Sequence, residues 1–183
     1  MKLKLLLIVL AMLLLVSSVT AKTLDEHMNE LLAKDGSDEK LPSGVSLILS
    51  GSTIQAYIVP EEYYSDYAAK LDDDPISFVS WENKTFTYAI IAETKSSRLK
   101  SIKEGEMLDE EPDVIILASE ASALRVFESE NGAKQAAAEV GDGNIIYEIT
   151  SGWLRFKMSM LEALAKFLGL FSQSIRDLLP IFG

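Results

Sequence analysis

The sequence predicts an α+β domain with a single mixed or mainly antiparallel sheet that is covered by helices. Short apolar, β-branched runs alternate only in part with amphipathic segments, so strands and helices are incompletely interleaved. The chain has no cysteine, and 48% of its residues are hydrophobic, so packing without disulfides must hold the core together. A long apolar helix, residues 153–183, is expected to close the chain.

The first third of the domain is predicted to contain a short helix and a hairpin. The helix begins at Thr23, where Glu26 completes a capping box, and ends at Gly36. Two apolar runs, Val45 to Leu49 and Ile54 to Val59, flank a turn of serine and glycine. β-branched runs on either side of such a turn are typical of two paired strands.

A second helix and a group of strands follow. Pro60 fits the first position of a helix over Glu61 to Leu71, which the aspartates before Pro75 terminate. Apolar content and the polar turn at Asn83 then favour strands. The strands expected here are Ile76 to Trp81, Thr85 to Thr94 and, more weakly, Leu99 to Lys103.

The last part of the domain alternates strand and helix. After an acidic loop over Gly105 to Pro112, the strand Asp113 to Ala118 delivers Ser119 as the cap of a helix that ends before Gly132. The remaining expected elements are a short helix over Ala133 to Val140, a strand marked by Ile145, Ile146 and Ile149, and the terminal helix from about Trp153.

The N-terminus has the layout of a secretory signal. Two lysines precede an unbroken apolar run from Leu5 to Val16, and small residues follow. We therefore predict a signal peptide over residues 1–21, with cleavage before Lys22, and an exported protein that is extracellular or associated with the cell surface. Retention of the segment as an anchor is the alternative. The remaining residues, 22–183, are enough for one domain.

Charge is distributed unevenly along the exported chain. Residues 22–183 contain 15 basic and 28 acidic side chains, a formal charge of −13, so nucleic acid is not expected as a partner. Residues 22–152 carry −15, whereas residues 153–183 carry +2. A basic amphipathic helix beside an acidic body suits an anionic lipid surface, although a solvated stripe on a docked helix has the same pattern.

The terminal helix has a narrow polar stripe on a broad apolar surface. The stripe consists of Arg155, Ser159, Glu162, Lys166, Gly169 and Gln173, which recur in steps of four and three. So wide an apolar arc favours a helix that borders a lipid cavity or meets a membrane, while core packing stays open as the alternative. The candidate lipid-binding residues are Trp153, Phe156, Met160, Leu164, Phe167, Leu168 and Phe171.

From Ala92 onward the segments occur in a particular order. They are Arg98 to Glu106, Pro112 to Ile116, a helical stretch to Val140, Gly143 to Glu148 and the closing helix. In this order the chain resembles the sterol carrier protein type 2 family of lipid-binding and lipid-transfer domains. The resemblance implies an apolar tunnel that the terminal helix helps to cover, with a lipid or another apolar compound as the ligand.

Three features depart from that family's pattern. Residues 60–81 look like an insertion between strands that family members join tightly. The glycine that usually follows the last strand is represented only by Gly152. The predicted signal peptide is unlike the intracellular members of the family, so the chain is expected to be a secreted variant.

No pattern of catalytic residues is evident. His27 is the only histidine, and its charged sequence neighbours favour a solvated side chain. Without cysteine or a second histidine, neither a metal site nor a cofactor is expected, and a hydrolase would need His27 as its base. The run Asp72 to Asp74 is interpreted as a helix terminator rather than a calcium loop, because it lacks the alternate spacing and glycine of such loops.

Two further motifs have simple interpretations. Asn83 begins an N-x-T triplet and is a candidate for glycosylation in a host with that machinery. Tyr63, Tyr64 and Tyr67 are expected to pack the second helix on the sheet rather than to present an aromatic surface to a ligand.

Two functions from different classes are consistent with these observations. The first is non-enzymatic binding of an apolar or amphipathic lipid in a cavity beneath the C-terminal helix. The alternative is an adaptor at the membrane surface, which uses the C-terminal amphipathic helix as its lipid anchor and its acidic body to recruit a protein. The sequence does not indicate an oligomeric state.

Overall fold

The structure is a computed structural model that describes residues 22–35, 40, 49–96, 98–107, 111–157 and 159–160. It contains a five-stranded mixed sheet in the order β3-β2-β1-β4-β5. Only β1 and β4 run parallel, and the other neighbouring pairs are antiparallel. The α+β class with a mixed sheet is therefore as predicted. The strands are β1 Thr53–Val59, β2 Tyr88–Lys95, β3 Arg98–Glu104, β4 Val114–Ser119 and β5 Ile145–Ile149.

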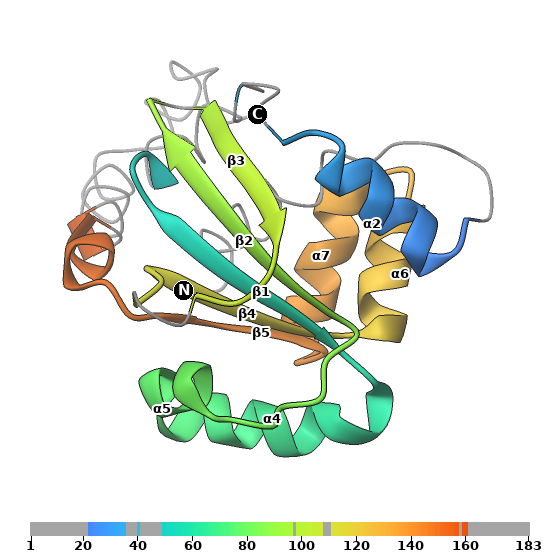
Figure 1. Cartoon of the computed structure of the whole chain (residues 1–183), viewed down its shortest axis with the longest axis horizontal. Coiled ribbons are helices and arrows are strands. Elements are labelled where there is room, and N and C mark those ends of the chain that lie inside the picture. The colour runs from blue at the N-terminus through green and yellow to red at the C-terminus, as the bar shows by residue number, and fades with distance from the viewer. Residues whose placement is uncertain are drawn as a thin grey trace, which may run out of the picture.

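Helices cover both faces of this sheet (Figure 1). One face packs against α2, α6 and α7, and the other packs against α4 and α5. Because β1 and β4 are central and covered on both faces, their side chains are buried almost without interruption. The helices are α2 Leu24–Leu32, α4 Glu61–Asp73, α5 Pro75–Ser80, α6 Glu120–Glu128 and α7 Gly132–Gly141.

Capping side chains set the starts of three helices, and the sequence predicts the first two of these caps. Thr23 and Glu26 form the capping box of α2, with the Glu26 N–H donating to Thr23 Oγ1 at 3.3 Å and the Thr23 N–H donating to Glu26 Oε2 at 2.7 Å. Ser119 Oγ accepts the N–H of Ser122 at the start of α6. Asn131 caps α7 by accepting the N–H of Lys134 at 2.9 Å.

One predicted strand and the predicted hairpin are wrong. Residues 76–80 belong to α5, because Asp74 accepts the Ser77 N–H at 3.1 Å and Pro75 occupies the first turn, both of which favour a helix start. The predicted hairpin fails because β2 and β4 occupy both sides of β1, which leaves no place for residues 45–49. Leu49 is helical and buried, and residues 45–48 lie outside the described residues.

Residues 60–81, expected from the sequence to be an insertion, cover the second face of the sheet. Tyr67 and Leu71 of α4 and Phe78 of α5 are buried against Tyr57 of β1. Tyr67 packs edge-on against Phe78 at 6.0 Å between ring centroids, and its hydroxyl accepts the N–H of Thr85 at 2.9 Å. The expectation of packing on the sheet is confirmed for Tyr67 and, in part, for Tyr64, whereas Tyr63 is 38% exposed. The segment is therefore an integral part of the core.

The two ends of the chain are described only in part. Residues 152–157 and 159–160 are helical, so the terminal helix begins where the sequence predicts, but residues 161–183 lie outside the described residues. The predicted signal peptide, residues 1–21, also lies outside them. Within the part of the chain that the structure describes, no helix is long and apolar enough to cross a membrane.

Candidate functional site

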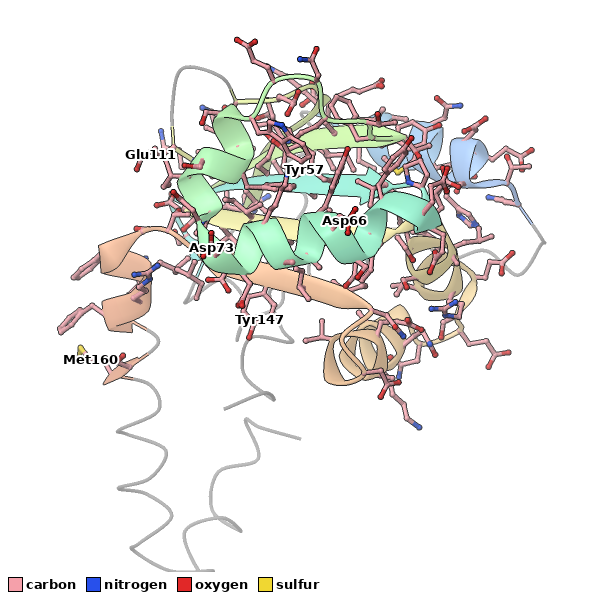
Figure 2. All side chains as sticks on the ribbon, turned by 90° about the horizontal axis from the view of Figure 1, so that it is seen from below. Tyr57, Asp66, Asp73, Glu111, Tyr147 and Met160 are labelled. Carbon is pink, nitrogen blue, oxygen red and sulfur yellow. The ribbon has the colours of Figure 1, made fainter. Side chains whose placement is uncertain are left out.

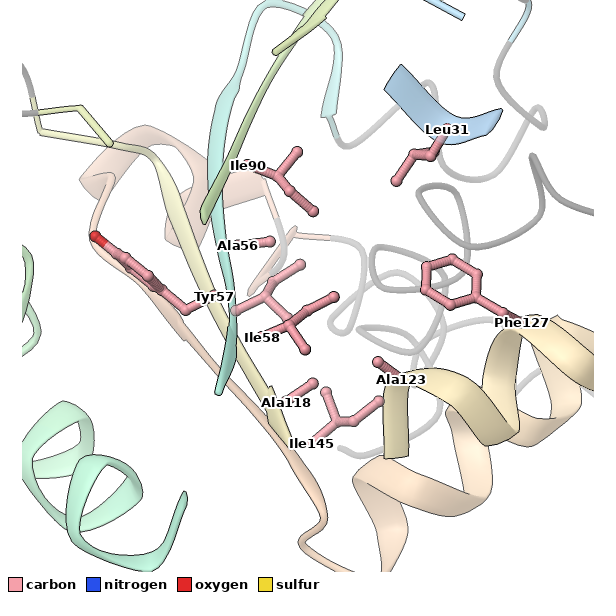
Figure 3. A pocket seen from close by; sticks show the side chains of 10 residues that line it. Leu31, Ala56, Tyr57, Ile58, Ile90, Ala118, Ala123, Phe127 and Ile145 are labelled. Atoms are coloured by element: carbon pink, nitrogen blue, oxygen red, sulfur yellow. The ribbon is translucent and has the colours of Figure 1, made fainter. Parts of the chain in front are cut away.

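An apolar cavity of about 50 Å³ lies between the sheet and the helices α2 and α6. Its described walls present no polar surface. In Figure 3, Leu31 of α2 and Phe127 of α6 face isoleucine and alanine side chains of the strands. Tyr57 borders the cavity from its strand, but its ring points to the opposite face. The lining residues are Leu31, Ala56, Tyr57, Ile58, Ile90, Ile116, Ala118, Ala123, Phe127 and Ile145.

Alanines in the sheet account for this hollow. Ala56 of β1 pairs with Ile90 on one side and with Ile116 on the other. Ala118 of β4 in turn lies between Ile58 and a β5 isoleucine. A methyl group set between larger neighbours leaves space above the strand, and Ala123 of α6 does not fill that space from the helix side. The cavity is thus a property of the sequence at three alanine positions.

Helix α2 forms part of the cover through one apolar stripe. Met28 and Leu31 are buried, and Leu24 and Leu32 are partly buried against the same cluster. Beyond this packing, α2 and the turn after it are joined to the sheet by two polar contacts that connect described residues. The Ile102 N–H donates to Asp35 Oδ1 at 2.9 Å, and the Tyr88 hydroxyl bonds to Asp25.

His27 also belongs to this buried stripe, and the prediction of a solvated histidine is wrong. Its side chain is fully buried, and its ring stacks on Phe127 with centroids 5.2 Å apart. Neither ring nitrogen has a hydrogen-bond partner in the described part of the chain. His27 lies one helical turn before Leu31, on the same face of α2. That spacing was visible in the sequence, but the charged neighbours of His27 concealed it.

The opposite face of the sheet contains a buried polar network. Lys84 Nζ is 3.0 Å from Glu106 Oε1, and it also donates to the carbonyl oxygens of Val79 at 2.7 Å and Trp81 at 2.8 Å. The Tyr57 hydroxyl donates to the same Glu106 oxygen at 2.9 Å. Burial, reinforced by the Glu106 charge, raises the pKa of Tyr57 above its ordinary value. Since every donor of Lys84 is used, the network fastens the segment after α5 to the loop after β3.

A second network joins α6 to α7. Both oxygens of Glu139 accept hydrogen bonds from Arg125, each at 2.7 Å. Gln135 donates to the same carboxylate at 2.7 Å, and Asn144 donates to it at 3.1 Å. These bonds, led by those from Arg125, lower the pKa of Glu139 to about 2. Glu139 is only 4% exposed, so its charge is balanced where it is buried.

The predicted lipid-binding residues that the structure describes are on the outer surface. Trp153, Phe156 and Met160 are 64%, 52% and 57% exposed, and none of them lines the cavity. The rings of Trp153 and Phe156 stack at 5.5 Å, while Met160 projects away from the sheet (Figure 2). The helix contacts the core through Leu154, which is 1% exposed. The other predicted residues, Leu164, Phe167, Leu168 and Phe171, lie outside the described residues.

The structure also describes the surroundings of two motifs that were named from the sequence. Asp72 and Asp73 belong to the last turn of α4, and Asp74 ends that helix and caps α5, so the predicted terminator is this single aspartate. Asn83 is exposed in a turn with φ of 63°, a left-handed conformation that asparagine tolerates, and its glycosylation stays a prediction.

Lys157, on the described start of the terminal helix, donates to the Ser50 carbonyl oxygen at 3.4 Å. Among the described residues, no group of three or more histidine, aspartate or glutamate side chains is arranged to hold a metal ion.

Comparisons with known proteins yield little. No family model matches the chain, and no curated protein matches it. Among solved structures, one described as "UbiJ-SCP2 Ubiquinone synthesis protein" aligns with 80% of this chain and 96% of its own, at 9% sequence identity and a TM-score of 0.36. So distant a likeness assigns neither a family nor a function to this chain.

Proposed function

We propose that this protein binds an apolar or amphipathic lipid, without transforming it chemically, on the sheet face beneath α2 and α6. The observation that carries this proposal is the cavity, whose described walls are entirely apolar. Such a hollow excludes water and favours a hydrocarbon chain, since each buried methylene group contributes about 0.8 kcal/mol. We thus place the lipid site under α2 and α6 and not under the first turns of the C-terminal helix, where the sequence predicts it.

The size of the cavity restricts how a ligand enters. A volume of about 50 Å³ is far below the roughly 300–1,000 Å³ of a typical ligand site, so a lipid chain requires displacement of its cover. Helix α2 is the element best suited to move. Both covering helices have nine residues, and helices shorter than about 12 residues depend on packing for their stability, but α6 is also joined to α7 by the hydrogen bonds between Arg125 and Glu139. A ligand that replaces the contacts of Leu31 and Met28 compensates for their loss.

The proposal is tested by filling the cavity. Ala123→Leu adds bulk at a lining position of α6, and it should weaken binding of a fluorescent fatty acid by about tenfold or more. Ala68→Leu is the matched control, because Ala68 is partly buried on α4 at the other face of the sheet. Equal affinity of the wild type and both variants would refute the site. Absence of lipid from the purified protein by native mass spectrometry, together with absence of probe binding, would refute the function.

A second candidate function is association with a membrane surface through the start of the terminal helix. The exposure of Trp153, Phe156 and Met160 on one stretch of helix favours it, because large apolar side chains exposed together mark interaction sites. Lys157, whose Nζ is 5.6 Å from the centre of a Trp153 ring, lies beside them and suits an anionic interface. In this function the acidic body recruits a protein partner, and the export predicted from the sequence puts the membrane contact outside the cytoplasm.

Vesicle flotation tests this second function. The double variant Trp153→Ser and Phe156→Ser should lose binding to vesicles that contain anionic phospholipid, and added salt should weaken binding of the wild type. Tyr63→Ser is the control, since Tyr63 is an aromatic residue that is 38% exposed on α4. If the double variant floats with the vesicles as well as the wild type does, the aromatic pair is not the membrane contact.

A further inference from the structure

His27 contains the only buried side-chain nitrogen or oxygen atoms that lack a hydrogen-bond partner within the described part of the chain. In contrast, the buried charged groups of the two polar networks have hydrogen-bond partners. Lys84 has three acceptors, and Glu139 has three donor side chains. An unpaired buried polar group destabilises a fold, so its presence at one defined position needs an explanation.

The position of His27 connects it with the cavity. Its ring lies against Phe127, with an interplanar angle of 15°, and Phe127 is a wall of the cavity. Leu31, one turn further along the same face of α2, is another wall. Only the Phe127 ring therefore separates the imidazole of His27 from the cavity, and His27 lies on the helix that must move when a ligand enters. Rotation of Phe127, or a shift of α2, would open the cavity to the imidazole of His27.

We propose that His27 is the polar end of the lipid site and hydrogen-bonds the carboxyl or hydroxyl group of a single-chain amphiphile. This inference rests on the proposed function. A neutral imidazole has one donor and one acceptor. They match the carbonyl oxygen and the hydroxyl of an uncharged carboxyl group, or the hydroxyl of an alcohol, so the ligand is bound without a net charge. The described walls contain no lysine or arginine, so a phosphate headgroup would be buried there without a counter-charge.

Nuclear magnetic resonance tests this proposal on the wild-type protein. Because His27 is the only histidine, a preparation without a histidine tag gives a single set of imidazole nitrogen signals. Palmitic acid and hexadecanol should each shift these signals at saturation, whereas a hydrocarbon of equal length should shift them less. Binding of the acid with the imidazole signals unchanged would overturn the proposal. This measurement needs no variant.

A substitution provides the second measurement. His27→Phe retains an aromatic ring on Phe127 and removes both nitrogens, so it should leave the fold at least as stable as the wild type. It should weaken binding of palmitic acid by about tenfold and change that of a pyrene-labelled hydrocarbon by less than twofold. Equal losses for both probes, no loss for either, or tight binding of a lysophospholipid would overturn the assignment of His27, while lipid binding itself would stand. If the wild type binds none of the probes, the proposed function fails and this inference fails with it.

Discussion

The Glu139 network predicts a specific dependence of stability on pH. The pKa of this carboxyl is about 2 in the folded protein, against an ordinary value of 4.5, and the hydrogen bonds from Arg125 are the main cause. A folded-state pKa below the unfolded value means that the stabilisation is fully present above about pH 4.5 and is lost as the pH falls toward 2. The difference corresponds to about 3 kcal/mol. Because the Arg125 side chain is 48% exposed, solvent screens part of its interaction with Glu139. We therefore expect the ionised Glu139 to stabilise the folded state by about 2 kcal/mol.

The variant Glu139→Gln isolates this contribution. At pH 7 its free energy of unfolding, measured in urea, should be about 2 kcal/mol below that of the wild type, and the gap should narrow as the pH falls from 4.5. Glu128→Gln is the control, because Glu128 is exposed on α6 and its substitution removes the same charge, with an expected effect within about 0.5 kcal/mol. If Glu139→Gln and the wild type lose stability in parallel between pH 5 and pH 3, the carboxylate is not the group responsible.

Three further predictions concern other parts of the chain. Lys84→Met should lower the free energy of unfolding by about 3 kcal/mol in a urea titration, because it leaves Glu106 without its cationic partner and two carbonyl oxygens without their donor. Thr23→Ala should lower it by about 1 kcal/mol in the same assay, because it removes the cap of α2. Sequencing of the exported protein should give Lys22 as its first residue.

For each of these three predictions, one outcome would contradict the stated reason. Lys84→Met as stable as the wild type would mean that the buried pair gives no net stabilisation. Thr23→Ser keeps a capping hydroxyl and should retain most of the stability that Thr23→Ala loses, so equal losses for the two would exclude the cap as the cause. An exported protein that begins at Met1 would support the retained anchor.

Local signals in the sequence were sufficient for most elements of the fold. Strands β2, β4 and β5 coincide with apolar runs between turn residues, the weaker prediction at β3 is also met, and α6 begins after its predicted cap, Ser119. The error at residues 76–80 came from ranking apolar content above the start signals, an aspartate cap followed by Pro75. The predicted hairpin failed for another reason. The partners of β1 are 30 to 60 residues away along the chain, and no local pattern identifies them.

The candidate site was less accessible to prediction. The cavity depends on alanines of β1, β4 and α6 that meet only in the folded protein. From its sequence, the terminal helix was assigned to the site because its apolar arc is wide. The helical periodicity alone, however, does not show which part of that arc faces the sheet and the other helices. Leu154 takes the inward position, while Trp153 and Phe156 face outward. For His27, by contrast, helical spacing from Leu31 was a usable signal.

The parallel pairing of β1 with β4 also affects the order in which the protein can fold. Ile54 pairs with Val114, so β1 lacks one of its two neighbours until about 60 further residues are available. Closure of so long a loop slows folding, and an unpaired apolar strand is prone to aggregation in the meantime. Fragments that end before β4 should therefore be insoluble. During synthesis the chain depends on its second half to protect its first.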